Sequence, residues 1–200
     1  AACMAFAKLE GFTAAPTLFY EFHGSETAVR EQAEMAADLA RARGGSDFRW
    51  ARQSDERNRL WRARHDAFYA AKALRPGATA WVTDVCVPIS RLAECIAETK
   101  KDLETASIPA PILGHVGDGN FHTVVLVDPD DPADIARAKA YMHRLVDRAL
   151  AMGGASTGEH GVGQGKMGYM LEEHGAAALA LRRAIKAALE AALEAREKAL

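Results

Sequence analysis

The sequence predicts an α+β fold, in which helices pack on one face of a mostly antiparallel sheet. Strand-like and helix-like segments alternate along the 200 residues, a length that suits one domain. Two expected strands, 111–117 and 120–127, are joined through Asp118-Gly119, a dipeptide typical of a tight hairpin turn. Because a hairpin makes its strands antiparallel neighbours, this pair favours an antiparallel sheet covered by helices.

The first part of the chain predicts two strands and two helices. β-branched and aromatic residues indicate strands over 17–22 (TLFYEF) and 48–51. Between them, Ser25 can cap a helix that stops at Gly44. A second helix is expected over 54–74.

The rest of the chain continues this alternation. A strand is expected over 79–87 and a helix over 88–106. After the hairpin, Asp131 can cap a helix that begins at Pro132 and ends at Gly153. A glycine-rich loop, a short helix and a long C-terminal helix complete the predicted order.

The C-terminal segment, 176–200, differs in composition from the rest. It contains no Gly or Pro and is dominated by Ala, Leu, Glu, Lys and Arg. Its large apolar side chains recur at every fourth position: Leu181, Ile185, Leu189 and Leu193. We expect an amphipathic helix that packs on a domain formed by 1–175 and carries no chemistry.

Composition and charge exclude several classes of protein. The net charge is −2 and the pI about 6.4, whereas a general nucleic-acid binder shows a basic face. No stretch approaches the roughly 18 apolar residues of a membrane span. Three scattered cysteines, Cys3, Cys86 and Cys95, form no CxxC pair and indicate reduced thiols in a cytosolic setting.

The hairpin places two histidines close together. If its turn contains two residues, His115 lies directly opposite His122 in the neighbouring strand. Gly117 then opposes Asn120, and the alternation of side chains puts both on the same face as the histidines. Two imidazoles at this separation can share a divalent metal ion, so the sequence predicts a metal site here.

The loop 156–166, STGEHGVGQGK, is expected to complete this site. Its glycines let the backbone approach other atoms closely, and its titratable residues include Glu159 and His160. Two neutral histidines and one carboxylate are typical of metal sites that leave positions open for a substrate. Such a site would carry a net charge of about +1 and would favour an anionic ligand.

Other interpretations of these residues stay open on the pattern alone. A histidine is more often a core or surface residue than a ligand, as we expect for His23, His65, His143 and His174. The glycine loop could bind a phosphate, but Met167 stands where the Walker pattern requires Ser or Thr. Arg64 could form an ion pair on the surface of its helix.

Five segments of the chain resemble the C-terminal domain of FAD-linked oxidases. They are PTLFYEFHGS, LWRARHDAFYAA, TDVCVPISRL, GHVGDGNFH and TGEHGVGQGK, and they follow the family's order over most of residues 16–175. The chain is most similar to the D-lactate dehydrogenase type, with glycolate oxidase and D-2-hydroxyglutarate dehydrogenase as relatives. The resemblance implies a ferredoxin-like substrate domain that covers FAD held by an N-terminal domain.

The resemblance also implies roles for the candidate residues. The ligands of zinc or manganese would be His115, His122 and Glu159. His160 would take the hydroxyl proton of the substrate, Asn120 would contact the substrate, and Arg64 would bind its carboxylate. The implied reaction oxidises a D-2-hydroxy acid of the D-lactate type to the 2-oxo acid, with hydride transfer to FAD.

The chain departs from the family at both ends. It begins roughly where the second domain of the family begins, so we expect no FAD binding and no oxidation of D-lactate by this chain alone. IKAALEAALEAREKAL stands in place of the usual C-terminal segment. The alternative interpretation is therefore an excised or redesigned domain that keeps a metal site without catalysis. We expect a cytoplasmic location in a bacterium, or a mitochondrial one if the parent protein is eukaryotic.

Overall fold

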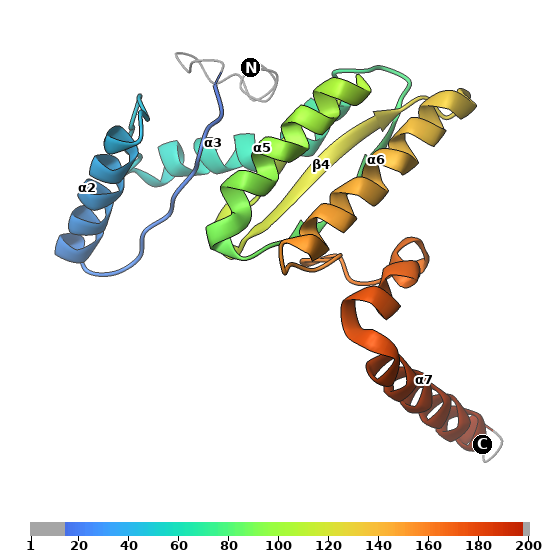
Figure 1. Ribbon diagram of the computed structural model, residues 1–200. Helices are drawn as coiled ribbons and strands as arrows, with labels where there is room; N and C mark the ends of the chain where they lie inside the picture. The colour runs from blue at the N-terminus through green and yellow to red at the C-terminus, as the bar shows by residue number, and fades with distance from the viewer. Residues whose placement is uncertain (1–14, 198–200) are drawn as a thin grey trace. The chain divides into compact units, whose positions relative to one another are not determined.

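The computed structural model of the chain describes residues 15–197, which divide between Leu74 and Arg75 into two compact units. These residues form six α-helices and one small antiparallel sheet of four strands, which confirms the predicted α+β class (Figure 1). The N-terminal segment with Cys3 lies outside this range. The other two cysteines, Cys86 and Cys95, are free thiols, as predicted.

The described part of the first unit, from residue 15 on, contains three helices. Helix α2 (Glu26–Ala42) begins at the predicted cap, because Oγ of Ser25 accepts a hydrogen bond from the amide of Ala28. The single helix expected over 54–74 is instead two, α3 (Ser54–His65) and α4 (Ala67–Lys72), which meet at Asp66.

The two strands predicted in the first unit are wrong. The segments 17–22 and 48–51 form no strand within the described part of the chain. Their aromatic side chains contact each other locally instead, as in the stacked pair Tyr20–Phe22, whose ring centroids lie 6.0 Å apart. Residue types that favour strands form one only where a neighbouring strand pairs with them, and no strand among residues 15–197 pairs with these segments.

The sheet of the second unit is centred on strand β4 (Asn120–Val127). Phe121 pairs with Val85 on one edge and with Gly114 on the other, so β4 has neighbours on both sides. One edge carries β1 (Thr79–Val82) and β2 (Val85–Cys86), and the other carries β3 (Ile112–His115). The strand predicted over 79–87 is thus interrupted at Thr83 and Asp84.

The predicted two-residue turn between β3 and β4 is wrong. Residues Val116–Asp118 form a short 3-10 helix (η1), and only Gly119 has a positive φ, of 77°. A type I′ turn needs positive φ at both central residues, and Asp118 does not adopt it. The observed pairs are His115 with Asn120 and Leu113 with His122, a shift of two residues from the predicted register. A shift of two leaves every side chain on its expected face.

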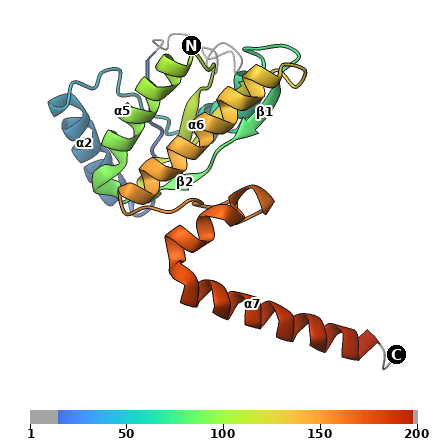
Figure 2. The same cartoon turned by 45° about the vertical axis from the view of Figure 1, so that its right-hand side comes forward.

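Helices α5 (Ile89–Ala106) and α6 (Pro132–Ala151) cover one face of this sheet (Figures 1 and 2). Helix α6 begins at the predicted cap, since Asp131 accepts a hydrogen bond from the amide of Ala133 at 2.8 Å. The side chains of β4 that face the helices are in the core: Phe121, Thr123, Val125 and Val127. Asn120 and His122 alternate with them, so they lie on the opposite face.

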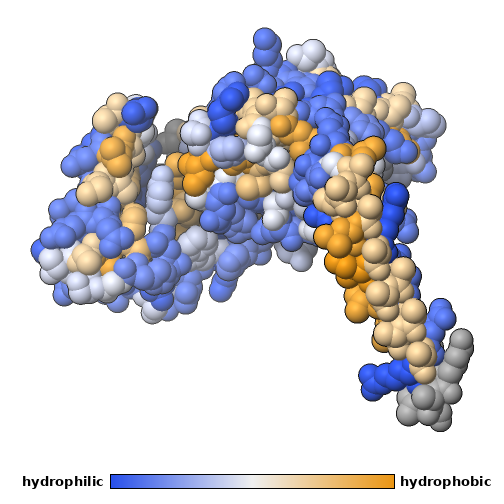
Figure 3. All heavy atoms as spheres, turned by 60° about the horizontal axis from the view of Figure 1, so that its bottom comes forward, coloured by the Kyte–Doolittle hydropathy of each residue, from blue (hydrophilic) through white to orange (hydrophobic). Residues whose placement is uncertain are grey.

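The last described elements are the 3-10 helix η2 (Gln164–Tyr169) and the long helix α7 (Met170–Glu197), which Gly175 interrupts at φ 77° and ψ 167°. The side chains of the apolar stripe that we expected to pack on the domain are 52–62% exposed: Leu181, Ile185, Leu189 and Leu193. Figure 3 shows apolar surface along this helix. The division of the chain at 175 stays a prediction. Among the described residues, no helix combines the length and hydropathy that crossing a membrane requires.

A buried carboxylate ties α6 to the end of β4. Asp134 accepts hydrogen bonds from the guanidinium groups of Arg75 and Arg137 and from the amide of Asp128, each at 2.7 Å. The Asp128 amide lowers the pKa of Asp134, burial opposes this shift, and Arg75 adds to the lowering. The carboxylate therefore stabilises the fold in its charged form.

Replacing Asp134 with Asn is expected to lower the free energy of unfolding by about 2 kcal/mol at neutral pH. The figure is modest because the side chains of Arg75 and Arg137 are 34% and 51% exposed and water screens them. A lowered pKa contributes stability above about pH 4 that is lost as the pH falls through the folded value. Urea unfolding should show that the free energies of unfolding of the wild type and of Asp134→Asn approach each other below about pH 4. A difference between them that is independent of pH would contradict this account.

Candidate metal and substrate site

His122 occupies the centre of the candidate site. It projects from β4 on the face away from α5 and α6, and its side chain is 5% exposed. Its Nδ1 lies 2.8 Å from the carbonyl oxygen of Thr83. Because a carbonyl only accepts, Nδ1 carries the proton of this hydrogen bond and Nε2 is the nitrogen that faces the site. Backbone contacts of this kind orient histidines that bind metals.

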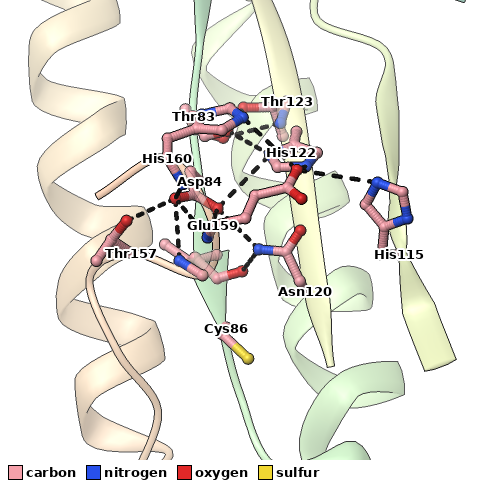
Figure 4. A network of polar contacts seen from close by, with 12 residues as sticks. Thr83, Asp84, Cys86, His115, Asn120, His122, Thr123, Thr157, Glu159 and His160 are labelled. Atoms are coloured by element: carbon pink, nitrogen blue, oxygen red, sulfur yellow. Dashed lines mark hydrogen bonds and ion pairs between the residues drawn. The ribbon is translucent and has the colours of Figure 1, made fainter. Parts of the chain in front are cut away.

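Glu159 and His115 converge on this nitrogen (Figure 4). Oε1 of Glu159 lies 2.9 Å from Nε2 of His122 and 3.9 Å from Nε2 of His115. With the proton of a neutral imidazole on Nδ1, Nε2 bears a lone pair, which a carboxylate oxygen repels. A proton or a metal ion must therefore lie between Nε2 and the carboxylate. The three ligand atoms all lie within 4.8 Å of one another. Ligands with bonds of about 2.1 Å are spaced by roughly 3 Å, so this group can hold one ion after small adjustments.

His160 lies beside this group. Its ring stacks on that of His122, with centroids 4.8 Å apart and planes inclined by 6°. Its Nε2 is 3.6 Å from Oε1 of Glu159, and its side chain is 47% exposed. The side chains of His115 and Glu159 are also about half exposed, so the site is open to solvent on this side.

Asn120 presents a buried acceptor without a partner. Its Nδ2 donates to Oδ1 of Asp84 at 2.7 Å and to the carbonyl oxygen of Val85 at 3.1 Å. Neither partner can donate, which fixes which end of the amide is the nitrogen. Its Oδ1 is buried and meets no donor among the described residues. Such a group costs free energy unless a ligand supplies the missing partner.

Asp84 is the residue that the sequence analysis missed. It lies between β1 and β2, is 1% exposed, and accepts hydrogen bonds from the 157–160 loop as well as from Asn120. Burial by itself raises the pKa of Asp84, but the bonds from Thr157, His160 and Asn120 outweigh it and hold this pKa well below its usual range. One signal was available, since Asp84 lies inside the strand expected over 79–87, and an acid that such a strand buries needs partners.

A second group of possible metal ligands contains Asp84, His122 and His160. The hydrogen bonds to Asp84 argue against it. Both carboxylate oxygens already accept from side-chain and backbone donors, which occupy their lone pairs. His115, His122 and Glu159 are therefore the better ligand set.

Five of the six predicted site residues meet in this one place: His115, Asn120, His122, Glu159 and His160. Arg64 lies on α3 in the other compact unit, so its role at this site stays a prediction. The remaining four histidines are exposed, as expected for surface residues, and each contacts another side chain. Their partners are Glu21 for His23, Trp61 for His65, Tyr169 for His143 and Glu173 for His174.

Comparison with known proteins shows which family the chain belongs to. Residues 2–192 match the family described as FAD linked oxidases, C-terminal domain. The chain belongs to this family. It is 51% identical over 186 residues to a probable mitochondrial D-lactate dehydrogenase of Danio rerio, and 43% identical over 177 residues to the mitochondrial D-lactate dehydrogenase [cytochrome] of Arabidopsis thaliana. It is also 30% identical over 170 residues to the glycolate oxidase subunit GlcD of Escherichia coli K12.

These alignments of the FAD-linked oxidase domain cover most of the chain but only part of each relative. They include 93%, 88% and 85% of the chain, and 37%, 31% and 34% of the three relatives in the same order. The chain thus spans about a third of the length of the relatives that it matches.

Proposed function

We propose that this chain is the metal- and substrate-binding part of an FAD-dependent dehydrogenase of D-2-hydroxy acids, of the D-lactate type. One observation carries the proposal. His122 is buried, is oriented through Nδ1 by the Thr83 carbonyl, and directs Nε2 at the Glu159 carboxylate. This arrangement prepares a nitrogen and an oxygen to share a divalent ion.

In this proposal His115, His122 and Glu159 hold zinc or manganese. When bound, the ion would act as a Lewis acid that lowers the pKa of a coordinated substrate hydroxyl. Two neutral histidines and one carboxylate leave a charge of about +1, which attracts the carboxylate of a 2-hydroxy acid. The open side of the site gives such a small anion access.

The other residues act on the substrate itself. His160 takes the hydroxyl proton on a ring nitrogen, and stacking on His122 keeps its ring in place. The unpaired Oδ1 of Asn120 accepts a hydrogen bond from the ligand. Arg64 binds the substrate carboxylate through its planar guanidinium group. FAD, held by the rest of the parent protein, supplies the hydride acceptor.

Binding of D-lactate to the chain is expected to depend on the metal. Isothermal titration calorimetry should detect D-lactate binding to the Zn²⁺-loaded chain and binding at least about tenfold weaker after chelation, because one chelate contact of about 1.4 kcal/mol corresponds to that factor. Propionate, which has a carboxylate but no hydroxyl, is the matched control and should bind weakly in both cases. Equal affinities for D-lactate and propionate would contradict chelation through the hydroxyl.

The same samples distinguish the alternative function. A chain that binds Zn²⁺ but no 2-hydroxy acid would be a domain that keeps a metal site without catalysis. Oxidation of D-lactate is expected only when an FAD-binding part is present, and turnover by this chain alone would contradict the proposal. The two D-lactate dehydrogenases above are named as mitochondrial proteins, so we propose that location if the parent protein is eukaryotic.

A further inference from the structure

Asp84 receives hydrogen bonds from two separate parts of the site. From β4, Nδ2 of Asn120 donates at 2.7 Å. From the loop after α6, Oγ1 of Thr157 donates at 2.6 Å, and backbone amides donate at distances of 2.9 to 3.3 Å: Gly158, Glu159 and His160. Figure 4 shows the carboxylate at the centre of these contacts. A buried carboxylate needs such donors, so they and the carboxylate hold one another in place.

The loop amides fix the backbone that carries two site residues. Successive amides point at one anion only when the chain curls around it, as in the anion-binding turns called nests. Glu159 and His160 project from this curl, on the side toward His122. Lys166 secures the far end of the loop, because its Nζ donates to the carbonyl oxygen of Asp84 at 2.6 Å.

The loop packs closely against Asn120 at Gly158. A Cβ placed on Gly158 would overlap Nδ2 of Asn120 and lie 3.0 Å from Oδ1 of Asp84. A larger residue at this position would have to displace the Asn120 side chain, so glycine lets the loop dock without breaking the bond between Asn120 and Asp84. The same docking holds Nδ2 of Asn120 against Asp84, so that the other end of the amide, Oδ1, stays available to a ligand.

We propose that Asp84 is the positioning residue of this site: it binds no metal or substrate, but it fixes the loop that presents Glu159 and His160 and the amide orientation of Asn120. What the site then does rests on the proposed function above. The positioning role of Asp84 does not depend on that function, because it follows from hydrogen bonds that exist without a ligand.

Amide hydrogen exchange in the 200-residue chain tests the proposal. In Asp84→Asn the residue loses its charge and one acceptor oxygen, so the amides of 158–160 should exchange at least about tenfold faster than in the wild type. The amides of Val124–Val127 in β4 report global opening and should keep their wild-type rates. Asp118→Asn makes the same chemical change at an exposed position and should leave all these rates unaltered. Wild-type exchange at 158–160 in Asp84→Asn would overturn the proposal.

Thr157 provides a second pair of variants in case Asp84→Asn does not fold. Thr157→Val removes one donor to Asp84, whereas Thr157→Ser keeps the hydroxyl. With Co²⁺ as the probe, Thr157→Val should bind about tenfold more weakly and change the visible spectrum of the bound ion, and Thr157→Ser should restore both. Thr157→Val with wild-type exchange and a wild-type spectrum would overturn the proposal. A wild-type chain without Co²⁺ binding would instead contradict the proposed metal site, and the exchange rates would still decide the role of Asp84.

Discussion

Replacing His122 with alanine is expected to lower the affinity of the chain for Zn²⁺ by about 100-fold or more. Changes to groups that only orient a ligand already cost about 10–100-fold, and removing a ligand itself should cost at least as much. Of the three proposed ligands, His122 is the one that the fold holds most firmly, since it is buried and its Nδ1 is hydrogen-bonded to the Thr83 carbonyl. Calorimetric titration with Zn²⁺ and metal analysis of the purified protein measure the effect.

Two further variants separate loss of the ligand from loss of the fold. His115→Ala removes a ligand whose side chain is 54% exposed, so it should weaken Zn²⁺ binding with little change in the melting temperature. His23→Ala removes a histidine from the other compact unit, with a side chain that is 83% exposed, and should bind Zn²⁺ like the wild type. Equal metal content in His122→Ala, His23→Ala and the wild type would defeat the site as described.

The elements that the sequence predicted well are those set by neighbouring residues. Helix α6 begins at Asp131 and Pro132 as expected, because a cap and an N1 proline act within one turn of helix. Ser25 caps α2 for the same reason. Strand β4 matches its predicted range, since it follows Asp118-Gly119 directly and its β-branched residues favour a strand.

The errors concern interactions between distant residues. The segments 17–22 and 48–51 have strand-like composition, but no neighbouring strand pairs with them among the described residues. The predicted hairpin turn is wrong because Asp118-Gly119 is compatible with several turn types, and the structure has a longer turn that contains η1. The prediction of His115 and His122 on one face survived this error only because the register moved by an even number of residues.

Asp84 shows why the rest of the site could not be read from the pattern. The hydrogen bonds to its carboxylate come from residues 36 to 76 positions away in the sequence, and no local spacing encodes them. The histidines and Glu159 could be proposed from the sequence because candidate metal ligands have distinctive chemistry. A buried acid that organises backbone amides has the same side chain as any surface aspartate, so only the folded structure identifies it.

Replacing Gly119 with alanine is expected to lower the free energy of unfolding by about 3 kcal/mol and to weaken Zn²⁺ binding as well. The residue has φ 77°, which an L side chain rarely adopts, and a Cβ there would overlap the carbonyl oxygen of Val87. That carbonyl belongs to rigid backbone, since the Val87 amide donates to the Gly119 carbonyl at 3.0 Å. Relief of the clash must therefore move the turn that precedes β4, and with it the spacing of His115 and His122.

Gly117 is the matched control for this prediction, because it lies in the same turn. It has no positive φ, and a Cβ there would meet nothing within 4 Å. Gly117→Ala should change the free energy of unfolding by less than about 0.5 kcal/mol and leave Zn²⁺ affinity at the wild-type level. Urea unfolding and Zn²⁺ titration of both variants give the comparison. If the two alanine variants were equally stable, the contact with Val87 would not constrain the turn. If they bound Zn²⁺ equally well, the turn would not set the distance between the two histidines.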